Sequence, residues 1–263
     1  YSAGILFKEG YNTFKKANDT LGMAGALGKR EYAFQYTGQY DSAFWAAYES
    51  LTLFEAVNAE PQVGIMNRTI AELLSAKKDY VQGIEKAKEA LRIHQKLDLP
   101  IEVALDHEVL ASNLLHLKRL DEALESQKKA IAIYQEDKSS MEYANGHNNL
   151  GNIYKKKGNL ELAEEAYRIA LTHPIGSQYP GFFQPIVANL GEIKMLQKDF
   201  KEALQLLIQS DSLIRSSGYN NNRAESYNHL SQTYEGLGDY PRALDHYKLY
   251  HHTQDSLLSL EKD

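Results

Sequence analysis

Small side chains recur at a fixed interval of 40 residues along most of this chain. One register of such residues holds Ala3, Ala43, Gly83, Ala123, Ala163, Ala203 and Ala243. A second register lies seven residues downstream and holds Gly10, Ser50, Ala90, Ala130, Ala170 and Ser210. Periodicity over this range indicates stacked structural repeats rather than one globular core. Because stacked repeats usually bind partners along a surface, the pattern predicts binding rather than catalysis.

The segment 144–171 predicts the content of one repeat, which is a pair of helices. Its apolar residues fall at intervals of three and four, which is the period of an amphipathic helix. Gly158 should end the first helix, because glycine accepts the left-handed backbone conformation found there. Asn159 should cap the second helix. We also expect Gly151 to meet Ala163 within the repeat, because small residues allow two helices to cross closely.

The spacing of these residues resembles the tetratricopeptide repeat (TPR). The matching positions in this segment are Leu150-Gly151, Tyr154, Gly158, Leu160, Ala163, Tyr167 and Ala170, and those of a later segment are Leu230-Ser231, Tyr234, Gly238, Tyr240, Ala243 and Tyr247. The resemblance implies an all-α fold, a right-handed superhelix (α-solenoid) of about six and a half helical hairpins. The 40-residue period is similar to that of longer TPRs in bacterial signalling proteins, among them Rap/PlcR-type peptide sensors, Bacteroidetes-like transcription regulators and sensor kinases.

The register predicts one TPR array over residues 1–263. Residues 1–20 would be the second helix of a truncated repeat, and 24–263 would hold six repeats, the last helix being extended. Second helices should start near residues 1, 40, 80, 120, 160, 200 and 240. The repeat at 24–37 is irregular, because Arg30-Glu31 stand where Leu-Gly is expected. A start at Tyr1 rather than Met leads us to expect a piece of a longer protein, or a mature form after processing.

Composition narrows the class of function. The net charge of −6 argues against nucleic-acid contact by this module, because phosphate binding needs a basic face. The sequence has no cysteine, no nucleotide-binding, hydrolase or zinc-protease motif, and no run of 18 apolar residues. We therefore expect no enzyme activity, no cofactor, no metal and no membrane span in this segment. The absence of cysteine is compatible with the cytoplasm and, as an alternative, with the periplasm.

Polar residues on the projected face of three later first helices form the candidate ligand site. By resemblance to TPR arrays these positions face the concave groove, and the candidates are Asn148, Asn149, Asn152, Lys156, Asn189, Glu192, Asn228, His229 and Gln232. Lys155 and Glu225 fall on the same projected face. An asparagine side chain can pair with both the N–H and the C=O of an extended peptide. The alternative is that these asparagines are simply solvated.

Three other parts of the sequence are alternative contact or packing sites. The groove of the second and third repeats offers a mixed set, including Ile65 and Arg68, that suits a helix or a protein domain. The segment 179–183 (YPGFF) either fills a packing gap or forms an exposed contact. His107 and His147 occupy a packing position between repeats. The cations of the dicarboxylate clamp found in chaperone-binding TPRs are missing, so capture of a free C-terminal carboxylate is not expected.

The sequence thus predicts a module that binds a peptide or protein partner in its groove. By resemblance it would be the sensing or docking part of a bacterial signal-transduction or transcription-regulatory protein. The alternatives are a stand-alone assembly scaffold and the non-catalytic input domain of a sensor histidine kinase. The C-terminal helix is a candidate for dimerisation.

Overall fold

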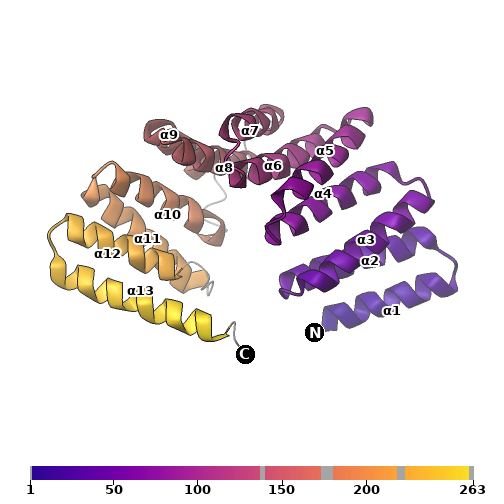
Figure 1. Cartoon of the computed structure of the whole chain (residues 1–263), viewed down its shortest axis with the longest axis horizontal. Coiled ribbons are helices and arrows are strands. Elements are labelled where there is room, and N and C mark those ends of the chain that lie inside the picture. Colours follow the sequence, from indigo (N-terminus) through magenta and orange to yellow (C-terminus); the bar gives the residue numbers. More distant parts are fainter. Residues whose placement is uncertain (1, 137–139, 173–179, 218–222, 261–263) are drawn as a thin grey trace. The chain divides into compact units, whose positions relative to one another are not determined.

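A computed structural model of the chain describes residues 2–136, 140–172, 180–217 and 223–260, and these residues form thirteen α-helices and no strand (Figure 1). The first helices of the hairpins are α2 (Thr20–Tyr36), α4 (Glu60–Ala76), α6 (Pro100–His116), α8 (Met141–Lys157), α10 (Pro180–Leu196) and α12 (Arg223–Gly236). The second helices are α1 (Ser2–Lys16), α3 (Tyr40–Ala56), α5 (Tyr80–Lys96), α7 (Leu120–Tyr134), α9 (Leu160–Leu171), α11 (Phe200–Ser217) and α13 (Tyr240–Leu260). The all-α prediction and the predicted starts of the second helices are confirmed, the largest offset being one residue at α1.

The helices fall into two compact units. Unit 1 comprises residues 1–134 with helices α1 to α7, and unit 2 comprises residues 135–263 with helices α8 to α13. Within each unit every helix packs against the next one along the chain, as successive antiparallel hairpins (Figure 1). Each unit is described by itself below, and the prediction of one continuous array over residues 1–263 stays a prediction.

The turns between helices follow the predicted chemistry in part. Gly158 and Gly238 have φ values of 79° and 77°, so both end their helices in the left-handed conformation as predicted. The Asn159 Oδ1 accepts a hydrogen bond from the Leu162 N–H at 3.1 Å, which confirms the predicted cap. Lys78, Lys118 and Lys198 hold the position of these glycines in other repeats, with φ values of 64°, 59° and 64°. The left-handed turn is therefore a property of the repeat and not of glycine alone.

Small residues lie where helices cross. Ala123 and Ala163 are fully buried, as the 40-residue register predicts. The atoms nearest to Gly151 belong to the ring of Tyr167, one helical turn beyond Ala163 on the second helix. A Cβ added to Gly151 would lie 2.5 Å from the Tyr167 Cε1. Glycine at this position makes room for a large buried tyrosine on the second helix.

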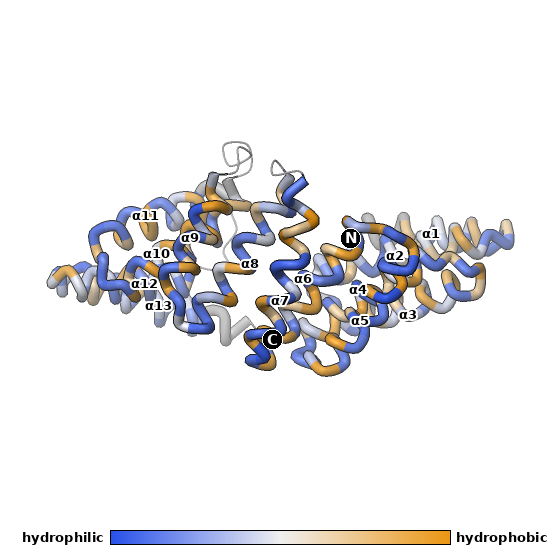
Figure 2. Tube along the Cα trace, turned by 90° about the horizontal axis from the view of Figure 1, so that it is seen from above, coloured by the Kyte–Doolittle hydropathy of each residue, from blue (hydrophilic) through white to orange (hydrophobic). Residues whose placement is uncertain are grey.

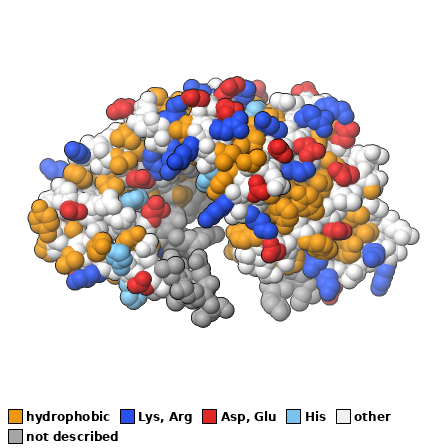
Figure 3. Space-filling model, viewed as in Figure 1, with side chains coloured by type: hydrophobic (Ala, Val, Ile, Leu, Met, Phe, Trp, Pro, Cys, Tyr) orange, Lys and Arg blue, Asp and Glu red, His pale blue; other side chains and the backbone are white. Residues whose placement is uncertain are grey.

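Each unit has its own apolar core. In unit 1 one buried cluster includes Ala43, Phe54, Met66 and Ile70. In unit 2 a buried cluster joins α9 to α10 and comprises Ala163, Tyr167, Ala170, Phe183, Ile186, Leu190 and Ile193. Hydrophobic and hydrophilic residues alternate along the helices, which gives each helix one face for the core (Figure 2). Acidic and basic side chains are interspersed on the face drawn in Figure 3.

Residues 180–183 form the first turn of a helix. Helix α10 begins at Pro180, and Phe183 is buried in the unit 2 core with Phe182 packed against it. These two phenylalanines therefore fill packing space, whereas Tyr179 lies outside the described residues. In the described part of the chain, no helix combines the length and the apolar character needed to cross a membrane.

Candidate functional site

The first helices α8, α10 and α12 of unit 2 contact one another in order, and their polar residues form the candidate site. The name "unit 2 face" is used here for Asn148, Asn149, Asn152, Lys155, Lys156, Asn189, Glu192, Glu225, Asn228, His229 and Gln232. Three repeats contribute to this set because equivalent positions recur every 40 residues. Stacking the repeats therefore places polar groups in rows along one side of unit 2.

Two of these helices are joined by a polar network. The Asn189 Nδ2 donates to the Asn148 Oδ1 at 3.3 Å, which connects α10 to α8. The Lys155 Nζ donates to the Asn189 Oδ1 at 3.3 Å and forms an ion pair with the Glu192 Oε2 at 2.7 Å. The side chains of Lys155 and Glu192 are only 17% and 23% exposed, so the pair is screened less by water than a surface ion pair. The network holds the asparagine amides in fixed positions.

A small polar pocket opens beside this network. Its volume is about 90 Å³, and α10, α11 and α12 supply most of its lining, together with Lys155 from α8. The Gln184 Nε2 donates to the Ser210 Oγ at 2.9 Å, and both side chains are buried. Ser226 also lines the pocket, is 6% exposed and has an Oγ without a hydrogen-bond partner. A buried hydroxyl without a partner is unfavourable, so this group is available for a polar atom that enters the pocket.

The polar lining departs from the pattern of the other repeats. Gln184 occupies the position that holds alanine in four other first helices, namely Ala24, Ala104, Ala144 and Ala224. Ser226 occupies a position that varies among the repeats, from buried Met66 and Ile186 to buried Asp106. A polar group thus replaces an apolar one at Gln184. Packing alone favours an apolar residue at such a position.

The candidate residues divide into three groups in the structure. Asn148, Asn189 and Glu192 take part in the network, and His229 lines the pocket together with Asn189 and Glu192. Asn152 instead accepts a hydrogen bond from the Tyr167 hydroxyl at 2.7 Å, so its amide supports its own hairpin. The last group forms the rim of the unit 2 face and comprises half-buried Asn149 and Asn228 and exposed Lys156 and Gln232. The Asn228 Oδ1 accepts a hydrogen bond from the Gln232 Nε2 at 3.1 Å.

Sequence reasoning missed the buried part of this site. The repeat positions place Lys155 on the projected face without marking it as a site residue, and they do not indicate Gln184, Ser210 or Ser226. A signal existed for Gln184, because it is a large polar residue at a position that holds alanine or glycine in the other repeats. Ser210 gave no such signal, since serine is an ordinary small residue in its register.

The first helices of unit 1 carry a different polar network. The Arg68 Nη1 donates to the Glu102 Oε2 at 2.6 Å and to the Asp106 Oδ1 at 3.2 Å. His94, which is fully buried, lies with its Nδ1 2.6 Å from the Asp106 Oδ2 and its Nε2 3.2 Å from the Pro61 carbonyl oxygen. Both ring nitrogens of this buried histidine therefore have a hydrogen-bond partner. This network joins α4, α5 and α6, so Arg68 supports the fold.

Neighbouring residues determine the pKa of the Asp106 carboxyl and the space available to the His94 ring. Burial raises the pKa of Asp106, although hydrogen bonding to His94 and the charges of His94 and Arg68 oppose the rise. A Cβ on Gly64 would lie within 2.4 Å of the His94 Nε2, so glycine is needed there to admit the ring. Gly64 replaces the alanine found at this position in most other first helices.

The two histidines predicted to pack between repeats are buried, although the contacts described here lie within their own hairpins. The His107 Nδ1 lies 2.9 Å from the Ser126 Oγ of α7. His147 packs edge-on against Tyr143, with ring centroids 4.6 Å apart, and burial lowers the pKa of both histidines. Within the described residues no cluster of three or more His, Cys, Asp or Glu side chains could hold a metal ion.

The fold and the repeat geometry define an α-solenoid of helical hairpins. The family model of the tetratricopeptide repeat matches residues 102–173 and 184–250, which together exceed half of the chain. This chain belongs to the tetratricopeptide repeat family. No curated protein sequence matches it.

Several solved structures share this fold at low sequence identity. BtubC (BKLC) from P. vanneervenii is similar with a TM-score of 0.71 and 19% identity, over 83% of this chain and 92% of that chain. The Rap conjugation gene regulator of the plasmid pLS20, solved with the Phr* peptide, is similar with a TM-score of 0.70 and 16% identity. The match covers 94% of this chain and 78% of that chain. A Rap protein complexed with Competence and Sporulation Factor is similar with a TM-score of 0.67 and 15% identity, over 91% of this chain and 76% of that chain. At these identities the likeness establishes the fold alone.

Proposed function

We propose that the unit 2 face binds an extended segment of a partner polypeptide. The observation that carries the proposal is the row of fixed amides at Asn148 and Asn189 beside a polar pocket with the unpartnered Ser226 Oγ. An extended backbone presents alternating N–H and C=O groups, and primary amides can pair with both. His229 in the pocket lining and the rim residues Asn149, Lys156, Asn228 and Gln232 extend the proposed contact along unit 2, and Asn152 lies on the same helix as Asn149.

The charge balance of the site favours a peptide backbone over a phosphate. Glu192 neutralises Lys155 at 2.7 Å, and Glu225 adds a negative charge to the lining of the pocket. A phosphate site would need excess cations. The pocket volume of about 90 Å³ suits one small polar side chain of the bound segment, which the Ser226 hydroxyl and the Gln184 amide would recognise.

The biological role we infer is sensing or docking in a bacterial signal-transduction or transcription-regulatory protein. Support comes from the fold shared with two Rap proteins that were solved with the Phr* peptide and with Competence and Sporulation Factor. A stand-alone assembly scaffold, or the non-catalytic input domain of a sensor histidine kinase, is the alternative. The sequenced flanks of the gene decide between these roles, because an output domain beside this segment would exclude the stand-alone scaffold.

The binding proposal is tested with peptides selected from a random display library on the whole chain. For a selected peptide, the double variant Asn148→Ala, Asn189→Ala should weaken binding at least tenfold by calorimetry. Losing a buried hydrogen-bond partner costs about 1–3 kcal/mol, and about 1.4 kcal/mol corresponds to tenfold in affinity.

A matched control removes two amides from outside the site. Gln205 and Gln209 are exposed on α11, and the double variant Gln205→Ala, Gln209→Ala should bind with unchanged affinity. Ser226→Ala should weaken binding while leaving the melting temperature unchanged or higher, because it removes a buried hydroxyl without a partner. Equal affinities of the Asn148/Asn189 and Gln205/Gln209 double variants would refute the proposal.

A further inference from the structure

Unit 1 contains a larger pocket that the peptide site of unit 2 does not explain. Its volume is about 340 Å³, within the range of small-molecule and side-chain sites. Its lining comes from four helices, α1 to α4, and consists of Phe7, Gly25, Gly28, Lys29, Tyr32, Phe54, Gln62, Ile65 and Met66.

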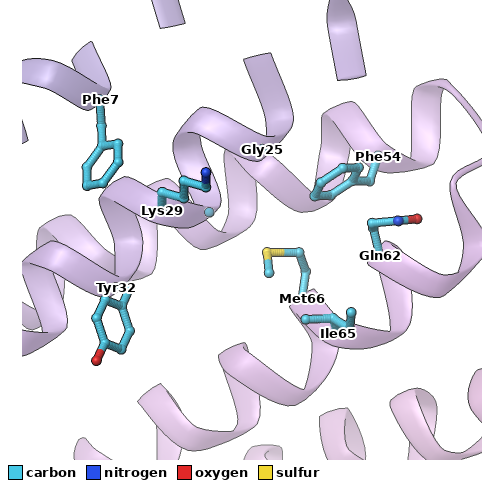
Figure 4. A pocket seen from close by; sticks show the side chains of 9 residues that line it. Phe7, Gly25, Lys29, Tyr32, Phe54, Gln62, Ile65 and Met66 are labelled. Carbon is cyan, nitrogen blue, oxygen red and sulfur yellow. The ribbon is translucent and has the colours of Figure 1, made fainter. Parts of the chain in front are cut away.

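The walls of this pocket are apolar. Figure 4 shows Phe7 on one side and Phe54, Ile65 and Met66 on the other, with Gly25 and Lys29 between them. Figure 3 shows hydrophobic side chains gathered over α3 and α4 on the drawn face of unit 1. Apolar walls around such a volume favour an apolar occupant, because its transfer from water is favourable.

Two glycines on α2 give the pocket its depth, and the fold does not require the first of them. Gly25 and Gly28 lie three residues apart on one side of the helix. A Cβ added at Gly25 would meet no atom within 4 Å, and one at Gly28 would make only ordinary contacts, the nearest at 3.6 Å. The equivalent residues of α4 are Ile65 and Arg68. Since glycine is a poor helix former, the open space beside Gly25, with room for a Cβ also at Gly28, points to a group that approaches the helix closely.

Lys29 is the one charged residue among the residues that line this pocket. Its side chain is exposed, and it forms no ion pair within the described part of the chain. Lys29 also holds the repeat position of Asn149 and Asn189, which belong to the unit 2 face. The pocket therefore opens on the first-helix side of unit 1, with a cation at its edge that is complementary to a carboxylate.

We propose that this pocket binds a large apolar side chain, aromatic or branched aliphatic, from a partner polypeptide that carries a carboxylate next to it. The apolar side chain would occupy the space over Gly25 and Gly28, between Phe7 and Met66. The neighbouring carboxylate would pair with the Lys29 ammonium at the edge. A polypeptide is favoured over a lipid because the pocket lies at the repeat positions that form the peptide site proposed for unit 2. The choice of a polypeptide rests on the function proposed for unit 2, whereas the pocket is a separate site whose occupancy is measured separately.

The four methionines of the chain provide a direct test. The whole chain is labelled with ¹³C at the methionine methyl groups, and Met66 reports on the pocket while Met141 and Met195 report on unit 2. The probes are three capped tripeptides, Glu-Phe-Glu, Glu-Ala-Glu and Lys-Phe-Lys, together with decanoate. We expect Glu-Phe-Glu to shift the Met66 signal saturably, at least tenfold more tightly than Glu-Ala-Glu and threefold more tightly than Lys-Phe-Lys. The Met141 and Met195 signals should not move.

Three variants separate binding from folding. Gly25→Leu should fill the pocket and weaken Glu-Phe-Glu binding at least tenfold, with a melting temperature equal to or above that of the wild type because leucine is a good helix former. Gly25→Ala should bind within threefold of the wild type. Lys29→Gln should remove the preference for Glu-Phe-Glu over Lys-Phe-Lys, and it decides the question if Gly25→Leu does not fold. An unmoved Met66 signal, unchanged binding by a folded Gly25→Leu, or decanoate binding at least as tightly as Glu-Phe-Glu would each overturn the proposal.

Discussion

At the scale of single residues, two glutamates lie in opposite environments. Glu31 on α2 is 5% exposed and its Oε1 has no hydrogen-bond partner. Burial, together with the negative charge of Glu72, raises the pKa of Glu31 to about 7. Partial burial alone would also raise the pKa of Glu164 on α9. Hydrogen bonds from Lys194, Gln197 and Arg168 outweigh that effect and lower the pKa of Glu164 to about 2.

The raised pKa of Glu31 gives a prediction for the pH dependence of stability. The folded state binds the Glu31 proton more tightly than the unfolded state, whose pKa is near 4.5. Its contribution is therefore fully present below pH 4.5 and is lost as the pH rises through 7. The quantity of interest is the unfolding free energy of Glu31→Gln minus that of the wild type. This difference should be about 2–3 kcal/mol larger at pH 8 than at pH 4. Urea unfolding at the two pH values measures this, and a difference that does not change with pH would contradict it.

Glu164→Gln is the matched control with the opposite sign. The lowered pKa of Glu164 stabilises the folded state above pH 4.5, and that contribution is lost as the pH falls through about 2. The variant should be less stable than the wild type at pH 7, and the difference should shrink as the pH falls from 4.5 towards 2.

A visible break in the repeat pattern marked one unusual residue but did not predict its environment. The sequence marked Arg30-Glu31 as anomalous, and Glu31 is indeed a buried carboxyl. The sequence did not reveal the hydrogen bond of Asn152 to Tyr167 or the burial of His94 against Asp106. Such pairings depend on side-chain directions across helices, which spacing alone does not determine.

At the scale of helices and hairpins, the 40-residue register predicted the order and limits of the elements. Close helix crossings need small residues at a fixed interval, so a crossing leaves a periodic trace in the sequence. Turns without glycine, such as those at Lys78 and Lys198, leave no such trace. The contact between Tyr167 and Gly151 could not be predicted either, because the two residues lie on different helices.

Ala163 tests the helix crossing directly. It is fully buried in the cluster that joins α9 to α10, so Ala163→Leu should overpack the contact and lower the unfolding free energy by about 1–3 kcal/mol. Lys156→Ala trims an exposed side chain on α8 and should change stability by less than about 0.5 kcal/mol. Thermal melts of the two variants decide the matter, and equal midpoints would mean that the buried face of α9 is wrongly assigned.

At the scale of the whole molecule, the chain is a tetratricopeptide repeat protein whose two units differ in the chemistry of their first helices. Unit 1 contains an apolar pocket lined by α1 to α4 and, between α5 and α6, the buried His94–Asp106 pair, whereas unit 2 carries fixed amides and a polar pocket. The sequence predicted the polar face of unit 2 because asparagines gathered at recurring positions. It could not predict either pocket, since a pocket is the space left by side chains from three or four helices.

The absence of cysteine allows the central claim, peptide binding at the unit 2 face, to be tested by site-directed labelling. Lys156→Cys places a thiol on the exposed rim of that face, and Gln209→Cys places one on the exposed surface of α11. The measurement is the rate of maleimide alkylation with and without a saturating selected peptide. The proposed site predicts at least tenfold slower alkylation at residue 156 and an unchanged rate at residue 209. Protection of residue 209 alone, or of neither residue, would contradict it.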